Sequence, residues 1–180
     1  SAEGKTVRLA AGSIGTTAFA GEIEIATDQL ESAITTTGGI NIAGLRTISA
    51  GTINAANGVG DVSLGANDGK LTLTAQVRAN KATVFATTGG IMMDAGSAIT
   101  TAAGATMTAD GDMLVTEITA SAMTSQTLLS ATGALTDNSA DEPTAGWNID
   151  TFGLVELSAA TIGTSLDGFD VRTDTLNAIT

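Results

Sequence analysis

Short runs in which apolar residues alternate with Thr, Ser or charged residues follow one another along the whole chain, and glycines separate them. Such alternation is typical of β-strands that bury one side. The runs are TVRLAA (6–11), EIEIAT (22–27), INIAG (40–44), DVSLGA (61–66), KLTLTAQV (70–77), ATVFAT (82–87), IMMDA (91–95), ATMTAD (105–110), MLVTEIT (113–119), TLLSAT (127–132) and LVELSA (154–159). No apolar stripe of helical length and period accompanies them. The sequence therefore predicts an all-β fold.

The shortage of large side chains decides between the forms of all-β fold. Aromatic residues are only 3% of the chain, whereas a sandwich or barrel needs bulky residues to fill its core. A β-solenoid stacks small aliphatic side chains in ladders along its axis. We therefore predict a parallel β-helix of about nine rungs, each of roughly 20 residues, forming a rod about 43 Å long. The five Met residues are expected to fill gaps in its core, and Asp61 and Asp68 to shape turns.

One phrase near the start of the chain returns near its end. VRLAAGSIGT (7–16) and VELSAATIGT (155–164) are identical at six of ten positions, and IATDQL (25–30) resembles VRTDTL (171–176). Two similar blocks in the same order indicate a long internal period. The prediction is a single solenoid segment over residues 1–180, made of one repeat of about 147 residues plus an overlap in which 7–34 resembles 155–180.

The phrases GGINIAG (38–44), GDVSLGA (60–66) and GGIMMDA (89–95), with TTGGI and LSAATIGTS, resemble the repeats of giant filamentous-haemagglutinin-like and autotransporter-type surface proteins of Gram-negative bacteria. The likeness covers most of the chain. It implies that the β-helix is right-handed, that the protein is exported to the cell surface or beyond it, and that its role is structural or adhesive. It implies no catalytic residue.

The composition excludes several classes of chemistry. The chain has no His, Cys or Tyr, which rules out His-based triads, thiol nucleophiles and cysteine or histidine metal sites. The few Arg residues are scattered, so no catalytic site and no resident cofactor is predicted, and the chain is expected not to be an enzyme. A net charge of −12 argues against nucleic acid as a partner. No apolar run in this segment is long enough to span a membrane.

Residues 137–152 depart from the rhythm of the strands and are predicted to form a protruding loop. The loop contains the densest acidic stretch, and Asp137, Asp141 and Glu142 are candidate calcium ligands. An ordinary exposed loop is the simpler explanation, because the stretch lacks the glycine and the distant Glu of an EF-hand. It also holds the only Trp and the only Pro of the chain, Trp147 and Pro143. An exposed Trp is suited to covering its own solenoid, packing on a neighbouring rod or stacking on a sugar ring, so Trp147 and Pro143 are candidate interaction residues.

Three functions remain open from the sequence. The first is a structural repeat of a giant exported bacterial surface protein, which forms a fibre, stalk or surface layer by head-to-tail contact with neighbouring repeats or subunits. The second is an adhesin shaft whose loop binds a glycan or a host protein. The third is a β-helical enzyme acting on polysaccharides, which would need clustered carboxylates and a base.

Overall fold

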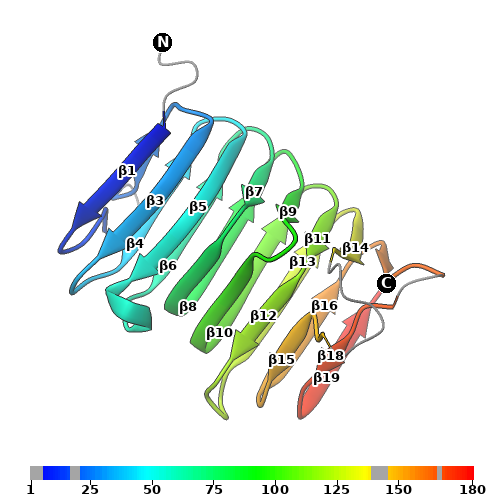
Figure 1. Cartoon of the computed structure of the whole chain (residues 1–180). Helices are drawn as coiled ribbons and strands as arrows, with labels where there is room; N and C mark the ends of the chain where they lie inside the picture. Colours follow the sequence, from blue (N-terminus) through cyan, green and yellow to red (C-terminus); the bar gives the residue numbers. More distant parts are fainter. Residues whose placement is uncertain (1–5, 17–20, 139–145, 166–167) are drawn as a thin grey trace.

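The computed structural model describes residues 6–16, 21–138, 146–165 and 168–180. Nineteen strands pair into one continuous parallel sheet, which coils into a β-solenoid of about seven turns. The coil is right-handed, with its axis running from β1 (Thr6–Ala11) at one end to β19 (Thr175–Ile179) at the other (Figure 1). The predicted all-β parallel β-helix is thus confirmed. Among the described residues, no helix is long and apolar enough to cross a membrane.

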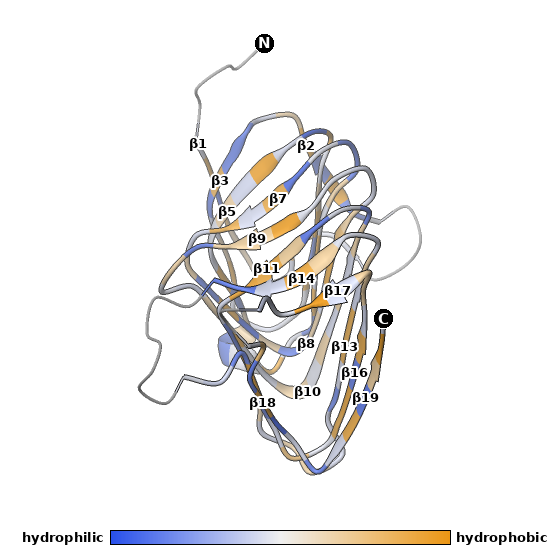
Figure 2. Cartoon of the chain, turned by 90° about the vertical axis from the view of Figure 1, so that its right-hand side faces the viewer, coloured by the Kyte–Doolittle hydropathy of each residue, from blue (hydrophilic) through white to orange (hydrophobic). Residues whose placement is uncertain are grey.

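Each turn of the coil passes over three faces, which we name A, B and C in chain order and which enclose the core when viewed along the axis (Figure 2). Face A consists of β7 (Leu71–Leu73), β9 (Ile91–Met93), β11 (Met113–Val115), β14 (Ala134–Asp137) and β17 (Thr161–Ile162). Three longer strands begin on face A and continue onto face B: β1 (Thr6–Ala11), β3 (Gln29–Thr35) and β5 (Ile48–Ala55).

Face B also holds β12 (Glu117–Ala120), β15 (Ile149–Thr151) and β18 (Val171–Arg172). Two strands run from face B onto face C, namely β8 (Gln76–Ala86) and β10 (Ala98–Ala109). The remaining strands of face C are β2 (Ile23–Ile25), β4 (Ile40–Gly44), β6 (Val62–Ala66), β13 (Gln126–Ala131), β16 (Leu154–Ser158) and β19 (Thr175–Ile179). A single 3-10 turn, η1 (Ala56–Gly58), lies at a corner between faces B and C.

One aliphatic ladder runs along face B through every turn. Its members, paired in succession, are Leu9, Ala33, Ile53, Val77, Ile99, Ile118, Ile149 and Val171. The six inner members are fully buried, whereas Leu9 and Val171 at the two ends are only half-buried. Each inner residue is thus covered by a neighbouring turn on both sides, and each end residue on one side only.

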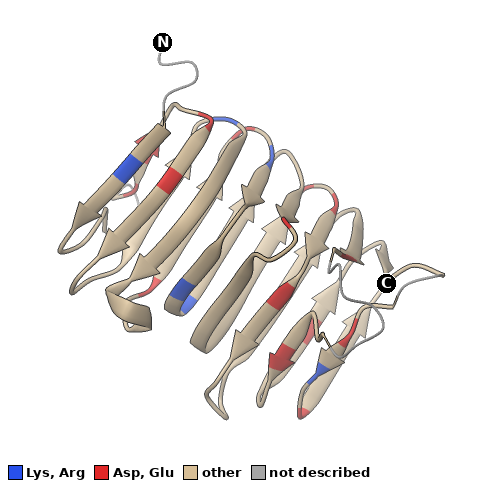
Figure 3. Ribbon diagram, in the orientation of Figure 1, with Lys and Arg blue, Asp and Glu red and all other residues tan. Residues whose placement is uncertain are grey.

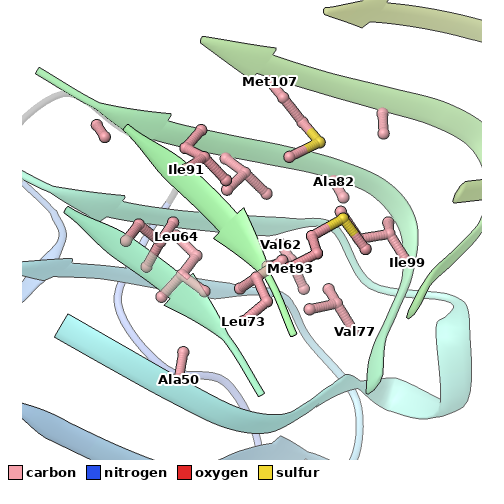
Figure 4. Packing of buried hydrophobic residues seen from close by; sticks show 14 of the residues in the cluster. Ala50, Val62, Leu64, Leu73, Val77, Ala82, Ile91, Met93, Ile99 and Met107 are labelled. Carbon is pink, nitrogen blue, oxygen red and sulfur yellow. The ribbon is translucent and has the colours of Figure 1, made fainter. Parts of the chain in front are cut away.

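Face C carries a second ladder and ends in a column of small residues. The ladder consists of Ile42, Leu64, Val84, Met107, Leu129, Leu157 and Ala178. Where the chain leaves this face, Gly44, Ala66, Ala86, Ala109 and Ala131 lie one above another. Small side chains at this corner allow the strands of faces C and A to meet closely, and the ladders interlock between the faces (Figure 4).

Polar side chains tie successive turns together at the corners. Asp61 accepts hydrogen bonds from the Asn80 side chain at 2.9 Å and from the Lys81 backbone N–H at 3.1 Å, both one turn further on. Asp68 accepts one from the Thr88 hydroxyl at 3.0 Å. Both carboxylates therefore lie at corners, and the hydrogen bonds that they accept join one turn of the coil to the next.

The coil has fewer turns than the nine rungs expected because most turns are longer than 20 residues. Val62 pairs with Ala82 after 20 residues, but Leu128 pairs with Glu156 only after 28. The register of the ladders is kept, and the additional residues lie between the paired strands. Seven successive pairings along face A at roughly 4.8 Å each give a rod about 34 Å long.

Three of the five methionines fill the core, and two do not. Met93, Met107 and Met113 are fully buried, whereas Met92 and Met123 are 38% and 83% exposed. Met92 lies between two inward-pointing residues of β9, so the alternation of the strand directs it outward. Its neighbour Met93 packs among the aliphatic ladders (Figure 4).

The two similar sequence blocks lie on different faces of the coil. Val7 belongs to face A, where it pairs with Leu30, whereas Val155 belongs to face C, where it pairs with Thr127 and Leu176. The same alternation of aliphatic and polar residues suits either face. The predicted unit of about 147 residues therefore rests on the sequence alone.

A buried hydroxyl on face C provides a test of the packing. Thr127 is fully buried opposite Val155, and its hydroxyl has no hydrogen-bond partner. Since an unpaired buried hydroxyl is destabilising, Thr127→Val is expected to raise the free energy of unfolding by about 1 kcal/mol in urea titrations. Thr83→Val, at a half-exposed outward position of the same face, should leave it nearly unchanged. A lower free energy of unfolding in Thr127→Val would contradict the conclusion that the buried Thr127 hydroxyl is unpaired.

Candidate functional site

The predicted calcium ligands are only partly described. Asp137 is the last residue of β14, where it pairs with the core residue Val115, and its carboxylate accepts a hydrogen bond of 2.6 Å from the Asn148 side chain. Asp141, Glu142 and Pro143 lie outside the described residues. Within the described ranges, no group of three or more carboxylates is placed so that it could hold a metal ion. The calcium site stays a prediction.

The predicted loop at 137–152 is too long at both ends. Asp137 belongs to β14, and Ile149–Thr151 forms β15, which pairs with β12 and β18 on face B. Ile149 is fully buried in the face B ladder. Ile149 is the only aliphatic residue between Asn148 and Asp150, so the sequence showed too little alternation to predict a strand there. In the structure the strand forms because Ile149 pairs with ladder residues of the turns on both sides, which fixes its register.

A buried asparagine closes the corner where the chain returns to the coil. The Asn148 side chain is 1% exposed, and its amide donates to the backbone carbonyls of Val115 and Thr116 at 3.2 and 3.1 Å and to Asp137. Its carbonyl oxygen accepts from the Asp170 N–H at 2.8 Å. One side chain thus satisfies backbone groups of the turns on both sides. The sequence analysis missed this residue.

Trp147 lies on the outer surface beside face B and stacks on an arginine. The Arg172 guanidinium carbon is 5.6 Å from the centre of the Trp147 ring, and Trp147 is 40% exposed. Arg172 also forms a two-point ion pair with Asp150, in which Nε donates to Oδ1 at 2.7 Å. That hydrogen bond raises the pKa of the Arg172 guanidinium. The planar group is therefore held between a carboxylate and an aromatic ring.

A second exposed aromatic residue lies close to this stack. Phe152 follows β15 directly and is 58% exposed. It borders a small hollow of about 210 Å³, which Asp150 and the outward-pointing Thr100 and Thr119 also line. The sequence analysis singled out Trp147 but not Phe152. The available signal was the rarity of aromatics, since two of the five in the chain lie within six residues.

The charged residues lie mainly on the corners and the outer faces. Acidic residues are spread along the rod and outnumber the basic ones (Figure 3). Besides Arg172–Asp150, the described residues contain one other ion pair, Arg8–Glu31, in the first two turns. The hydrogen bond with Glu31 raises the pKa of the Arg8 guanidinium. Across the described ranges, the basic residues are dispersed and form no patch.

The two ends of the coil leave their ladders uncovered. Every residue of β19 is exposed, including Leu176 at 49% and Ile179 at 68%. A groove of about 610 Å³ lies along β13, β16 and β19, the last three strands of face C. At the other end, Val7 and Leu9 of β1 are half-buried and pack on one side only. Within the described part of the chain, nothing caps either terminal turn.

No protein-family model, curated protein or solved structure matched this chain.

The Asn148 corner gives a direct prediction. Asn148→Leu keeps the size of the side chain but removes the donor to the Thr116 carbonyl and to Asp137 and the acceptor of the Asp170 N–H. It is therefore expected to lower the free energy of unfolding by roughly 2–3 kcal/mol. Asn177→Leu, on the exposed strand β19, is the matched control and should change stability by less than about 0.5 kcal/mol. Equal effects of the two substitutions in chemical denaturation would rule out the proposed role of the corner.

Proposed function

We propose that this chain is a non-enzymatic structural segment of an exported bacterial surface protein, which builds a fibre, stalk or surface layer by end-to-end stacking of solenoids. The observation that carries the proposal is that the aliphatic ladders run through the coil to both terminal turns, where no described residue covers their outer side. An exposed ladder beside unpaired strand edges is stabilised when another turn of the same kind covers it. The resemblance of the sequence to filamentous-haemagglutinin-like repeats supports the exported location.

The proposed mechanism is mechanical. A pull along the axis is shared by the backbone hydrogen bonds that join each turn to the next on all three faces, so no single contact bears the load. The net charge of −12 makes the sides of two rods repel each other. The ends therefore remain the preferred places of contact.

A second function is supported by the exposed aromatic pair. Phe152 borders a hollow lined by hydroxyl groups and the carboxylate of Asp150, and Trp147 stacks on Arg172, the ion-pair partner of Asp150. Exposed aromatic rings with hydroxyl groups and a carboxylate provide the chemistry of a site for sugar rings. We propose this hollow as the place where the rod, acting as an adhesin shaft, would bind a glycan of a host surface.

End-to-end stacking predicts concentration-dependent association of the isolated chain. The mass measured by light scattering is expected to rise above the monomer value of 17.7 kDa as the concentration increases, and microscopy should show rods that grow in length only. Leu176→Lys, which places a charge on the uncovered ladder of β19, should abolish the growth. Val59→Lys, at a 78% exposed corner, should not. A constant monomer mass at all concentrations would disprove the proposal.

The glycan hypothesis is tested with the same chain on a panel of oligosaccharides. Trp147→Ala and Phe152→Ala are each expected to weaken binding of any retained sugar roughly tenfold or more, because each removes an apolar platform. Met92→Ala removes an exposed apolar residue of face A and serves as the control. Absence of binding by the wild-type chain, or equal loss in all three variants, would eliminate this second function.

A further inference from the structure

We propose that Asn57, together with Gly58, is a site of spontaneous deamidation that the folded coil holds closed, and that the buried hydroxyl of Thr35 keeps it closed. Asn57 and Gly58 belong to η1, which projects from the coil next to β6 (Figure 1, the short turquoise coil). They lie in an inner turn, so the site depends neither on how the ends of the rod are covered nor on whether the rod binds a glycan.

The residue after Asn57 makes this asparagine reactive. Asn57 is the only asparagine of the chain that a glycine follows. The backbone nitrogen of a glycine can attack the side-chain carbonyl carbon of the preceding asparagine, because no side chain hinders its approach. Asn57 is exposed, and a Cβ placed on Gly58 would meet no atom within 4 Å. Water therefore has access to the reacting atoms.

The reaction has two steps and needs only water and hydroxide. In the first, the Gly58 nitrogen gives its proton to hydroxide and forms a bond to Cγ of Asn57, while the bond from Cγ to Nδ2 breaks and Nδ2 takes a proton from water and leaves as ammonia. In the second, one water molecule opens either C–N bond of the cyclic imide. The product is aspartate, or isoaspartate, in which the main chain runs through the side-chain carbon.

The backbone of the folded corner prevents the first step. Asn57 has φ 56° and ψ 33°, which lies in the left-handed region. At this ψ the Gly58 nitrogen points away from the Asn57 side chain, whereas the cyclic imide needs the nitrogen and Cβ on the same side of the Cα–C bond. The ring can therefore close only after the corner has left its folded conformation.

The folded corner is strained. Ala56, Asn57 and Gly58 have φ of 47°, 56° and 90° in succession, and in the part of the chain that the structure describes no other non-glycine residue has a positive φ. An alanine in this region is unfavourable because its Cβ lies close to the following carbonyl oxygen. A strained corner at the surface opens more readily than the ladders beneath it.

Thr35 opposes the opening of this corner. It lies at the end of β3, one turn before η1, and is 3% exposed. Its hydroxyl accepts a hydrogen bond from the Ala56 N–H at 3.1 Å and donates one to the Gly38 carbonyl. When the corner opens, the bond to Ala56 is lost and a buried acceptor is left without its donor, which is costly. The Thr35 hydroxyl thus lowers the rate at which Asn57 reacts.

The modification is irreversible and changes the corner. Both products carry a new negative charge at residue 57, and isoaspartate also lengthens the main chain, so the left-handed turn cannot re-form with the same hydrogen bonds. The fraction of modified chains would therefore record how often this corner has opened during the lifetime of the protein.

The protection is tested by incubating the full chain at mildly alkaline pH, folded in buffer and unfolded in urea. Conversion of Asn57 is measured by peptide mapping with mass spectrometry. We expect the folded chain to react at least about tenfold more slowly than the unfolded chain. Equal rates in the two states would overturn the protection by the fold, and no conversion in urea would overturn the site itself.

Thr35→Val tests the role of the hydroxyl. It removes both hydrogen bonds and keeps the shape of the side chain, so Asn57 should convert about tenfold faster than in the folded wild type. Thr116→Val is the matched control, since Thr116 is 5% exposed and its hydroxyl donates to the Ser97 carbonyl at 2.6 Å at a corner between faces A and B. Equal acceleration in both variants would show that the reaction follows general loss of stability and would overturn the role of Thr35.

Two further variants decide the question even if Thr35→Val does not fold. Thr35→Ser keeps the hydroxyl and should react at nearly the wild-type rate. Ala56→Gly removes the cost of the left-handed conformation and should slow the reaction roughly threefold. Faster conversion in Ala56→Gly, with circular dichroism showing that it is folded, would overturn the proposed opening of a strained corner.

Discussion

The contact between one turn of the coil and the next is the interaction on which the rest of the structure depends. Parallel strands exchange backbone hydrogen bonds along the axis, and the same geometry places each inward side chain over its equivalent in the preceding turn. Ile118 is buried because Ile99 and Ile149 lie on either side of it along the ladder and residues of the other two faces share its core cluster. A chain with few aromatic residues can form such a core, since the ladders need only small aliphatic side chains that match from turn to turn.

The corners carry the polar part of this arrangement. Strands fix the faces, whereas the segments between them vary in length and must satisfy their own backbone groups. The exposed Asp61 carboxylate accepts hydrogen bonds from the following turn of the coil. The buried Asn148 side chain donates to backbone carbonyls of the preceding turn and accepts from a backbone N–H of the following turn. Because these side chains reach between turns, a longer corner leaves the ladders undisturbed. The clearest example is the long corner before β15, after which Ile149 rejoins the face B ladder.

The sequence predicted the fold class because two signals agreed: alternating runs between glycines, and too few bulky residues for a sandwich. It did not predict the number of turns, since corner length follows from contacts with the turns above and below. Ile149 was missed for a related reason, because one aliphatic residue becomes a strand only when its ladder neighbours are known. At the candidate sites, Trp147 stood out as the only tryptophan, but its partners Arg172 and Asp150 come from different turns, and no local pattern links them. The inward position of Asp137 likewise depends on the register of β14 with β11.

The half-buried ends of the face B ladder have a consequence for how the rod comes apart. Leu9 and Val171 each have a neighbour on one side only, so the outermost turns are held by about half of the contacts that secure an inner turn. Thermal fraying should therefore begin at the two tips and move inward, with the middle turns exchanging their amide hydrogens last. In the proposed end-to-end stacking, every junction between rods would remove two tips. Resistance to fraying would then grow with the length of the filament, which makes length itself a source of durability.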